Sequence, residues 1–442
     1  MPTSEKKVRI LQVSIRDEPG YLGKLAQAIG EAGVRIGDVV KLRAVGSANV
    51  RELELYVASE AQLELALAGV SRVEGVRIER VYDPVLEIHR GGKIRMRSTV
   101  PLQRIGDLRM IYTPGVATVC DEIQRHPEKV YDYTALGNTV AIVTNGSAIL
   151  GLGNVGVHAG LPVMEGKAVL FDRLVGLSGV PILIPTRDVT TFVETVVQIA
   201  PSFGAIQLED IAAPECFEIE RRLVEELPIP VMHDDQHGTA VVVLAALLNA
   251  MANDPRELRS LRVGVLGLGA AGTGIAQLLS AYGVKDLIGA DLRQEALRRF
   301  ELRGGRPADL DTVLAEADVV IATTGRRDLI SPDQVRSGQI VFALSNPEPE
   351  ITPEAALAAG AALAADGRVV NNALGFPGIF RGALTARARA ITDAMKLAAA
   401  HAIAGYAEPG ELVPGLLHTD VHMAVAEAVE QAADAESEDV EP

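Results

Sequence analysis

A glycine fingerprint behind a short apolar run constrains the fold of this chain more than any other feature. The run 263–266 has the composition of a buried strand, and Gly267-x-Gly269-x-x-Gly272 follows it directly. An apolar helical stretch at 275–279 comes next. In such a strand, turn and helix the glycines permit a tight turn, and the amides at the start of the helix hold a pyrophosphate. We therefore expect a dinucleotide site here; the alternative is tight strand–helix packing alone.

A strand-like run at 287–290 ends in Asp291, close to the roughly 20-residue spacing at which an acid meets the ribose hydroxyls of a dinucleotide. A carboxylate there repels a 2′-phosphate and favours NAD, although Arg293 lies close enough to leave NADP open. Strands and helices alternate from residue 240 onward, which indicates a doubly wound parallel sheet. The residues of this region that we expect to bind the cofactor are Gly267, Gly269, Ala270, Gly272 and Asp291.

The same glycine spacing occurs a second time, as Gly151-x-Gly153-x-x-Gly156. This copy follows the strand-like run 139–144 only after an intervening turn. We expect no helix to open at 157–162. The second copy is therefore not expected to bind a dinucleotide.

Composition excludes several classes of protein. A chain of 442 residues, 48% of them hydrophobic, is long enough for two or three domains with cores of their own. No apolar run reaches the roughly 20 residues of a membrane-spanning helix, and no basic stripe offsets the net charge of −16. We therefore expect neither a membrane nor a nucleic-acid partner. Cys120 and Cys216 lie far apart and no secretory signal pattern opens the chain, which favours a cytoplasmic protein.

Four segments are expected along the chain. A polar, glycine-containing stretch at 89–93 marks the first linker, and the C-terminus is strongly acidic. We expect an α/β protein with a ferredoxin-like N-terminal domain, a mixed α/β domain that carries the acidic residues, a doubly wound Rossmann-type NAD(P)-binding domain, and a disordered acidic tail. Their expected bounds are 1–85, 86–239, 240–430 and 431–442.

The N-terminal segment shows the order βαββαβ of a ferredoxin-like unit. With Asp17, Pro19, Gly20 and Leu22 in its first turn it resembles an ACT domain, a regulatory module that senses small molecules. The resemblance implies a small-metabolite effector at a dimer interface, and hence a homodimer or larger homo-oligomer. The alternative is a dimerisation domain that binds nothing. The strand-like runs are 8–15, 34–42, 52–58 and 76–81, and the helical stretches are 21–29 and 60–68.

Two acidic pairs, Glu209-Asp210 and Asp234-Asp235, lie in apolar surroundings upstream of the fingerprint. Each pair follows a strand-like apolar run, at a place where loops build binding sites. Carboxylates are rarely buried without a positive partner, and oxygen-only clusters suit Mg²⁺ or Mn²⁺ rather than zinc. Such a cluster beside a dinucleotide implies a redox step on an oxygen-rich substrate. On spacing alone, helix-cap or surface acids explain the pairs equally well.

Lys167 and Tyr112 are candidate proton carriers. Lys167 enters an apolar segment whose nearest acid in sequence is Glu165. A lysine beside a bound dication loses affinity for its proton and can act as a base; the alternative is a lysine whose stem merely covers apolar side chains. Tyr112 precedes a Thr-Pro-Gly turn, from which a phenol can reach a ligand, although most such tyrosines only pack.

A series of longer motifs contains most of these residues. In chain order they are Tyr112-Thr113-Pro114-Gly115-Val116-Ala117, Leu150-Gly151-Leu152-Gly153-Asn154-Val155-Gly156, Glu165-Gly166-Lys167, Glu209-Asp210, Asp234-Asp235-Gln236-His237-Gly238-Thr239-Ala240, Ser345-Asn346-Pro347 and Asn371-Asn372-Ala373-Leu374-Gly375-Phe376-Pro377-Gly378. In identity and order they resemble the motifs of malic enzymes, over about residues 93–387. Larger members of that family carry an arginine just before the second motif, where this chain has Ser147-Ala148-Ile149, as the smaller bacterial type does. The partner of the distal substrate carboxylate is therefore left open.

The resemblance implies oxidative decarboxylation of (S)-malate to pyruvate and CO₂ with reduction of NAD or NADP. Glu209, Asp210 and Asp235 are then expected to hold Mg²⁺ or Mn²⁺. Lys167, oriented by Asp234, is expected to take the proton of the malate hydroxyl as hydride leaves C2.

Three further roles follow from the same resemblance. Tyr112 is expected to protonate C3 of the enolpyruvate that remains after CO₂ loss, and Asn346 and Asn372 to hydrogen-bond the substrate carboxylate and the nicotinamide ribose. One alternative is a malolactic-type lyase that retains NAD and releases lactate, which accumulation of NADH would exclude. Another is an NAD-binding metabolite sensor, but the catalytic positions that can be mapped carry no substitutions.

Overall fold

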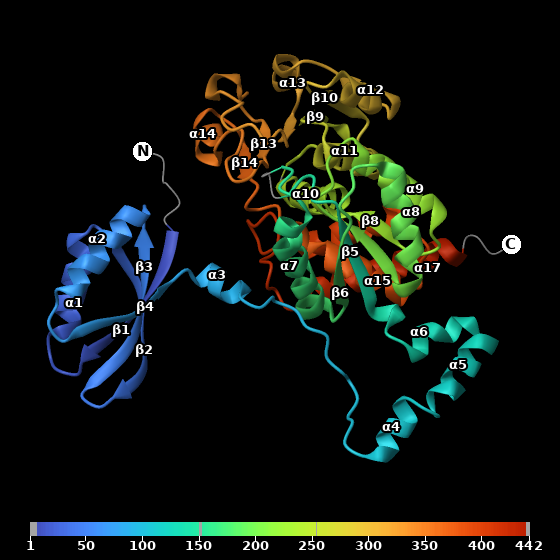
Figure 1. The fold of residues 1–442 in the computed structure, drawn as a ribbon. Coiled ribbons are helices and arrows are strands. Elements are labelled where there is room, and N and C mark those ends of the chain that lie inside the picture. The colour runs from blue at the N-terminus through green and yellow to red at the C-terminus, as the bar shows by residue number, and fades with distance from the viewer. Residues whose placement is uncertain (1–6, 150–152, 253, 439–442) are drawn as a thin grey trace. The chain divides into compact units, whose positions relative to one another are not determined.

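The computed structural model describes residues 7–149, 153–252 and 254–438 (Figure 1). The chain divides into two compact units, Met1–Arg95 and Met96–Pro442. Each unit has a hydrophobic core of its own, as separately packed domains do. Within these described ranges, the helices are too short or too polar to cross a lipid bilayer.

The N-terminal unit is a four-stranded antiparallel sheet with the strand order β2-β3-β1-β4. Leu11 and Val13 of β1 and Leu53 and Leu55 of β3 are fully buried and pack against α1 and α2. They alternate along the strands because successive side chains point to opposite faces. The order βαββαβ expected from the sequence is confirmed. The elements are β1 (Lys7–Arg16), α1 (Tyr21–Glu31), β2 (Arg35–Val45), β3 (Ala48–Val57), α2 (Glu60–Ser71) and β4 (Val76–Tyr82).

The end of this unit differs from the boundary expected after residue 85. A further helix, α3 (Pro84–His89), follows β4, and the unit ends at Arg95. Asp83 caps α3 by accepting two main-chain N–H groups, and the same carboxylate lies 2.7 Å from the guanidinium of Arg9 on β1. A helix that is capped and tied to the sheet in this way belongs to the sheet's unit. The polar composition of residues 89–93 predicted a linker and did not indicate that the unit continues to Arg95.

The larger unit contains two parallel sheets, and the smaller of them has the order β6-β5-β7-β8. Val140 and Ile142 of β5 pack toward α7, whereas Ala141 and Val143 pack toward α8 and α9. Helices thus cover both faces, as Figure 1 shows, which is why β5 is apolar throughout. The elements are β5 (Thr139–Thr144), α7 (Val157–Val175), β6 (Ser178–Leu183), α8 (Val189–Ile199), β7 (Ala205–Leu208), α9 (Glu215–Glu226) and β8 (Val231–His233).

The larger sheet has the order β11-β10-β9-β12-β13-β14, with parallel neighbours throughout. Counted from β9, this is the strand order of a doubly wound dinucleotide-binding domain. The doubly wound sheet expected after residue 240 is therefore confirmed. The elements are β9 (Arg262–Leu266), α11 (Ala270–Tyr282), β10 (Asp286–Ala290), α12 (Gln294–Leu302), β11 (Arg306–Pro307), α13 (Leu310–Glu316), β12 (Val319–Ala322), β13 (Ile340–Ala343), α14 (Pro353–Ala358) and β14 (Leu363–Asp366).

Helix α10 (Asp234–Ala250) joins the two sheets. It follows β8 directly, and the residues 241–247 in its middle are fully buried, as in a helix surrounded by core. It packs closely on α11, because a Cβ atom on Gly274 would lie 2.1 Å from the carbonyl oxygen of Gln236. The boundary expected between residues 239 and 240 falls inside this helix. The two sheets consequently share one hydrophobic core.

The second glycine pattern does open a helix, so the expectation for 157–162 is wrong. Helix α7 begins directly after Gly156, and Pro162 lies inside it. The helix forms because it buries an apolar stripe that includes Phe171, and this burial outweighs the backbone hydrogen bond lost at the proline. Gly151 lies outside the described residues, so nothing is known of the first part of that pattern.

The tail expected to be disordered from residue 431 is helical at first. Helix α17 (Val421–Glu438) packs with α15 (Phe376–Thr385) and α16 (Asp393–Gly405), and Ala432 and Ala433 are partly buried against the core. Alanine and glutamate favour helix, and this burial adds to their preference. Disorder is therefore wrong for residues 431–438, and 439–442 lie outside the described residues.

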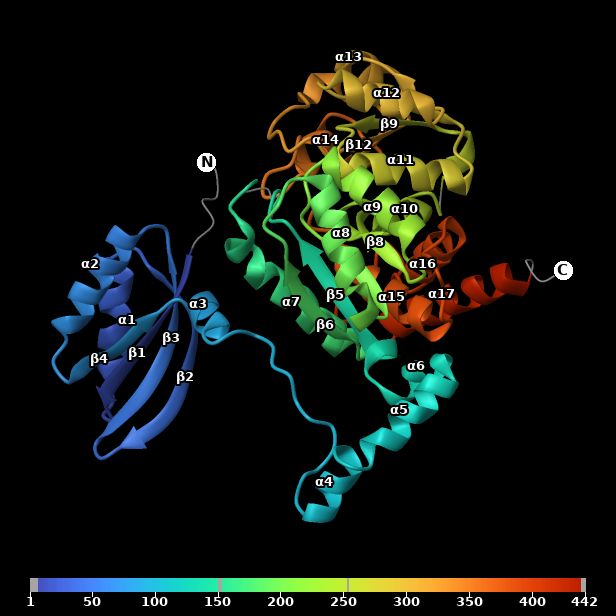
Figure 2. The same cartoon turned by 45° about the vertical axis from the view of Figure 1, so that its right-hand side comes forward.

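A helical arm precedes the smaller sheet. It consists of α4 (Ile105–Ile111), α5 (Val116–Arg125) and α6 (Val130–Tyr133). In Figures 1 and 2, α4 and α5 lie apart from both sheets of the larger unit. Ile105 and Met110 are each 69% exposed, so the arm presents apolar side chains to solvent.

Candidate active site

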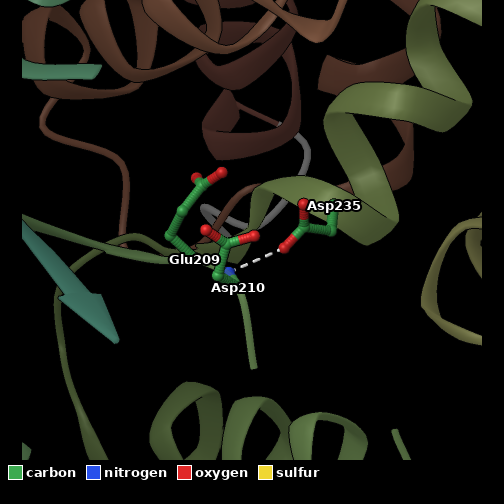
Figure 3. Close-up of side chains that lie close together, drawn as sticks. All are labelled: Glu209, Asp210 and Asp235. Carbon is green, nitrogen blue, oxygen red and sulfur yellow. Dashed lines mark hydrogen bonds between the residues drawn. The ribbon is translucent and has the colours of Figure 1, made fainter. Parts of the chain in front are cut away.

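Three residues of the two acidic pairs, Glu209, Asp210 and Asp235, meet at the carboxyl edge of the smaller sheet (Figure 3). Glu209 and Asp210 follow β7, and Asp235 stands in the first turn of α10 after β8, the neighbouring parallel strand. One carboxylate oxygen of each residue lies within 4.8 Å of the other two. The main-chain N–H of Asp210 donates to Asp235 Oδ2 at 2.8 Å. Three convergent carboxylates form an oxygen-only set of the kind that Mg²⁺ and Mn²⁺ prefer.

Electrostatic crowding is the main property of this cluster. Burial raises the pKa of Glu209 well above its usual value. The charge of Lys167 opposes the shift, while Asp235, Asp234 and Asp210 increase it. Because added positive charge relieves such crowding, the donor set fits a divalent cation.

Lys167 reaches the cluster from α7 and is 9% exposed. Its ammonium nitrogen lies 3.0 Å from Glu209 Oε1, donates to Asp234, and lies 4.5 Å from the centre of the Phe376 ring. Burial by itself would lower the pKa of Lys167, but the charges of Asp234, Glu209 and Asp235 outweigh it and hold the pKa above its ordinary value. The side chain is thus a buried, paired cation and not a surface lysine.

Asp234 faces Lys167 and Asn372. Asn372 Nδ2 donates to Asp234 Oδ2 at 2.7 Å, and Lys167 donates to the same oxygen. Gly238 leaves the space for this carboxylate, since a Cβ atom there would lie 1.9 Å from Asp234 Oδ1. The two adjacent acids therefore have separate surroundings, with Asp235 in the carboxylate cluster and Asp234 against the lysine.

The fingerprint at 267–272 forms a tight turn between β9 and α11. Gly267 has φ 87°, a left-handed conformation that glycine adopts without strain. A Cβ atom on Gly272 would lie 1.9 Å from the Gly267 carbonyl oxygen, so the helix can approach the strand only with glycine at this position. Gly269 caps α11 and Ala270 is its first residue. The main-chain N–H groups at this helix start are suited to a pyrophosphate.

Asp291 follows β10 at the edge of the same turn. Its Oδ2 accepts the N–H of Leu268 at 2.7 Å, and its Oδ1 accepts the N–H of Arg293 at 2.8 Å. Burial would raise the pKa of Asp291, but these two main-chain donors and the Arg293 side chain hold it below its usual value. An ionised carboxylate thus lies at the position where the sequence analysis predicts a contact with the ribose of the dinucleotide.

A cavity of about 730 Å³ extends from Asp235 of the carboxylate cluster to this turn. Its lining includes Asp235 of the cluster and Gly269 and Ala270 of the turn. Asn346 and Asn372 line the same space. A ligand held at the carboxylates can therefore lie beside a dinucleotide.

Comparisons with known proteins agree with this geometry. The sequence profile of the malic enzyme N-terminal domain matches residues 91–189 and 185–224, and that of the malic enzyme NAD-binding domain matches 307–434. The NAD-binding domain of D-isomer specific 2-hydroxyacid dehydrogenases matches 240–328. The NAD-dependent malic enzyme 1 of Bacillus subtilis (strain 168) is 52% identical over 428 residues, 96% of this chain and 98% of that protein. The chain belongs to the malic enzyme family.

Two further similar proteins are malic enzymes. The bifunctional malic/malolactic enzyme of Bacillus subtilis (strain 168) is 43% identical and aligns with 79% of this chain and 92% of its own. The crystal structure of the malic enzyme from Pyrococcus horikoshii Ot3 matches with a TM-score of 0.76 at 43% identity, over 80% of this chain and 90% of that one. The identification from sequence motifs is thus confirmed.

Tyr112 is the one expected residue of the malic enzyme site that lies far from the carboxylate cluster. It follows α4 on the arm and is 66% exposed. Both views place α4 well away from α7 and α10, which carry Lys167 and Asp235 (Figures 1 and 2). Within this one chain, the phenol does not meet the buried lysine.

Two buried residues support the site without having been expected there. Gln207 Nε2 donates to Glu209 Oε2 at 2.6 Å, and strand alternation could have indicated this, since the two residues share one face of the chain. Glu350 is fully buried and its Oε1 accepts hydrogen bonds from the Thr324 N–H at 2.7 Å and the Ser345 hydroxyl at 2.6 Å. It thereby ties together the loops after β12 and β13. Thr324 lies 26 residues from Glu350 in the sequence, so no local pattern revealed this link between the two loops.

The crowding of the carboxylates predicts a gain in stability for Glu209→Gln when divalent metal is absent. A carboxyl group whose pKa is higher in the folded than in the unfolded state destabilises the fold once it is ionised, above its unfolded pKa. Glutamine removes that charge and should raise the free energy of unfolding at neutral pH. Urea unfolding in EDTA measures the change, with the exposed Glu194→Gln as control. A variant less stable than the wild type in EDTA would contradict the crowding argument.

Proposed function

We propose that this malic enzyme converts (S)-malate to pyruvate and CO₂ with reduction of NAD⁺ in a metal-dependent reaction. The observation that carries the proposal is that one and the same cavity is lined by Asp235 of the carboxylate cluster and by Gly269 of the dinucleotide turn. Malate held at the carboxylates would have its C2 hydrogen facing a nicotinamide in the same cavity. The family of the chain supports the same reaction.

Glu209, Asp210 and Asp235 are the proposed metal ligands. Their convergence within 4.8 Å and the raised pKa of Glu209, caused first by burial, favour a resident dication. A bound Mg²⁺ or Mn²⁺ supplies Lewis acidity that polarises the C2 oxygen of the substrate. Gln207 holds Glu209, and the main chain of Asp210 holds Asp235, so contacts within this chain orient two of the three carboxylates.

Lys167 and Asp234 are proposed to move the hydroxyl proton. Lys167 is buried at the cluster, where it would accept the proton of the C2 hydroxyl as hydride leaves C2. Burial raises the pKa of Asp234, against the opposing charge of Lys167. Asp234 holds the lysine through this direct contact. A dication bound at the carboxylates would offset the negative charges that keep Lys167 protonated, so that the lysine could become neutral and act as a base.

Tyr112 is proposed to deliver a proton to C3 of enolpyruvate after CO₂ has left, but from a second copy of the chain. Its arm lies apart from its own cluster and presents Ile105 and Met110 to solvent. A second copy that covered this apolar surface would remove it from water and bring a phenol to a neighbouring site. We therefore propose a homo-oligomer in which each site combines Lys167 of one chain with Tyr112 of another.

The two carboxylates of malate need separate partners. Asn346 and Asn372, which line the cavity, are proposed to hydrogen-bond the substrate carboxylate and the nicotinamide ribose. Arg368 lines the same cavity, and its guanidinium lies 2.6 Å from Asp366 while the side chain is 78% exposed. A guanidinium on this wall suits the distal carboxylate. Arg368 would then replace the arginine that larger family members carry before the second motif.

Asp291 supports NAD as the preferred cofactor. Its ionised carboxylate is fixed by Leu268 and Arg293 at the end of β10, where a 2′-phosphate would be repelled. An enzyme named NAD-dependent aligns over 96% of the chain. The Arg293 side chain is 48% exposed and lines the cavity, which leaves NADP as a weaker cofactor.

A malolactic-type lyase is a second candidate, because a bifunctional malic/malolactic enzyme is 43% identical to the chain. The two reactions differ in their products. Oxidative decarboxylation of malate gives pyruvate with one NADH for each CO₂, whereas a malolactic reaction gives lactate without net NADH. Absorbance of NADH, compared with pyruvate and lactate from the same sample, distinguishes them.

Loss of the metal ligands should abolish malate oxidation without abolishing NAD binding. Asp210→Asn and Asp235→Asn each remove one anionic ligand, while the dinucleotide turn at 267–272 is untouched. We expect losses of at least about 100-fold in kcat/KM, with the Kd for NAD unchanged. Turnover assays with Mn²⁺ and with EDTA, beside NAD titrations, measure both quantities. Full turnover in EDTA would refute the metal assignment.

Two impaired variants should complement each other in the formation of pyruvate if Tyr112 acts from a second copy. Lys167→Ala should lose malate oxidation, and Tyr112→Phe should slow tautomerisation of enolpyruvate more than reduction of a keto acid. After subunit exchange at equal amounts, half of the dimers contain both variants and have one complete site, so activity should recover to about a quarter of that of the wild type. Exchange without any recovery would mean that Tyr112 does not serve the partner's site.

We further propose that the N-terminal unit binds a small metabolite at an interface between two copies. The edge strand β2 exposes Val40 and Val45, at 52% and 55%, which suits pairing with a second sheet. Gly20, with φ 91°, precedes α1 and leaves the helix start open to an anionic group. Arg35 begins β2, so the expected ligand is more acidic than an ordinary amino acid.

Deletion of residues 1–95 tests this regulatory proposal, because the structure ends the unit at Arg95. Basal malate oxidation should survive, since the carboxylate cluster and both parallel sheets lie in the larger unit. Effectors should lose their effect on the Kd for malate. In the full chain this effect is expected to be about 5–150-fold, and malate should change effector affinity by the same factor. Identical responses of the truncated and full chains would make the unit purely structural.

A further inference from the structure

A buried carboxylate on α9 holds the segment that carries one of the proposed metal ligands. Glu220 is 9% exposed, and its Oε1 accepts the main-chain N–H of His233 at 2.7 Å. Its Oε2 lies 3.0 Å from His237 Nε2. His233 ends β8 and His237 lies in the first turns of α10. One carboxylate therefore clamps both ends of the short segment that contains Asp235.

The clamp continues directly to the metal cluster. The His233 ring is fully buried, and its Nε2 lies 3.4 Å from Asp235 Oδ2, a contact too long for a well-formed hydrogen bond. The same Oδ2 accepts the N–H of Asp210 at 2.8 Å. Asp235 is thus held through its own backbone segment and through contacts at a single carboxylate oxygen. Its side chain is 34% exposed, which makes it the ligand most dependent on such support.

The charge of Glu220 is maintained by its neighbours. Burial would raise the pKa of this carboxyl, but the charge and hydrogen bond of His237, together with the charge and main-chain N–H of His233, hold it at about 2. An ionised carboxylate in this position makes charge-assisted hydrogen bonds, which are shorter and stronger than neutral ones. These bonds therefore favour one orientation of the backbone segment that carries Asp235.

We propose that Glu220 is a positioning residue for metal binding, which aims the carboxylate of Asp235 through His233 and His237. This inference deepens the proposed metal site and rests on it. Outer partners of metal ligands determine ligand orientation, and their loss weakens metal affinity by about 10–100-fold. Neither Glu220 nor His237 belongs to the three-carboxylate cluster, and neither lines the 730 Å³ cavity, so their effect on catalysis must pass through the metal ligand.

The test measures metal affinity directly, with Mn²⁺ titrated into the full-length protein without malate or NAD. Glu220→Gln keeps the size of the side chain and an acceptor for the His233 N–H but removes the charge, so the Kd for Mn²⁺ should rise about 10–100-fold. Glu218→Gln, an exposed position of the same helix, is the matched control and should leave the Kd unchanged. The KM for Mn²⁺ should rise in parallel for Glu220→Gln, while kcat at saturating Mn²⁺ stays within about twofold.

A second pair of variants at His237 makes the test independent of Glu220. His237→Gln can still donate from its amide to Glu220 and should retain Mn²⁺ affinity, whereas His237→Ala loses that bond and should weaken it. Unchanged Mn²⁺ binding in both Glu220→Gln and His237→Ala would overturn the inference. The inference would also be overturned if Glu220→Gln lowered NAD affinity by the same factor as Mn²⁺ affinity and lowered thermal stability as well. That pattern would indicate a merely structural role.

The same titrations separate this inference from the metal site itself. Asp235→Asn removes the proposed ligand and should bind Mn²⁺ far more weakly than the wild type. If the wild type bound Mn²⁺ no better than Asp235→Asn, the metal site would be wrong and the positioning role would fall with it. If the wild type bound Mn²⁺ tightly and Glu220→Gln bound it equally well, only the positioning role would be wrong.

Discussion

Crowding of negative charge at the carboxyl edge of the smaller sheet is the constraint on which the rest of the site depends. Glu209 and Asp210 are 2% and 4% exposed, and they converge with Asp235 within 4.8 Å. Such a group is tolerated only beside compensating charge. Lys167 supplies part of it, at 3.0 Å from Glu209. The start of α10 supplies more, because the positive end of a helix dipole stabilises the acids in its first turn.

Helix α10 fixes the distance between the carboxylate cluster and the dinucleotide turn. Its first turn carries Asp235, its middle is buried on all sides, and it packs against α11, which begins at the dinucleotide turn. The contact at Gly274 allows the two helices to approach at backbone distance. A hydride can pass only between atoms held a few ångströms apart. The close packing of two helices, and not a flexible linker, therefore sets the relation between the carboxylates and the cofactor turn.

Local sequence patterns predicted those parts of the structure that the local sequence determines. The glycine fingerprint indicated β9, α11 and the doubly wound sheet. The two acidic pairs indicated a binding site because each follows a strand-like run, and the structure places both strands side by side in one parallel sheet. Local patterns failed where distant packing decides the outcome. Pro162 is accepted inside α7 because the helix buries Phe171, and the acidic C-terminus stays helical to Glu438 where Ala433 packs on the core.

Partners far apart in the sequence were beyond the reach of pattern analysis altogether. Glu220 meets His233 and His237 from a separate helix, and Asn372 meets Asp234 across 138 residues. Such pairings depend on how helices pack over a sheet, which spacing within one segment does not encode. Tyr112 is the extreme case, because its motif indicates a catalytic role while its own chain leaves it 66% exposed on the arm. The motif predicts the role of Tyr112, and the proposed assembly would supply its location.

The separation of Tyr112 from the carboxylate cluster of its own chain has a consequence for the proposed mechanism. In the proposed mechanism, hydride transfer would need the cluster, Lys167 and the dinucleotide turn, and all of these lie in the larger unit of one chain. Protonation at C3 would need Tyr112 of a second copy, and the proposed effector site also lies between copies. An effector that alters how two copies pair would therefore act on delivery of the phenol, through a shift between two arrangements of the assembly. It should change release of pyruvate from enolpyruvate more than reduction of NAD, because only the first of these steps would cross the interface.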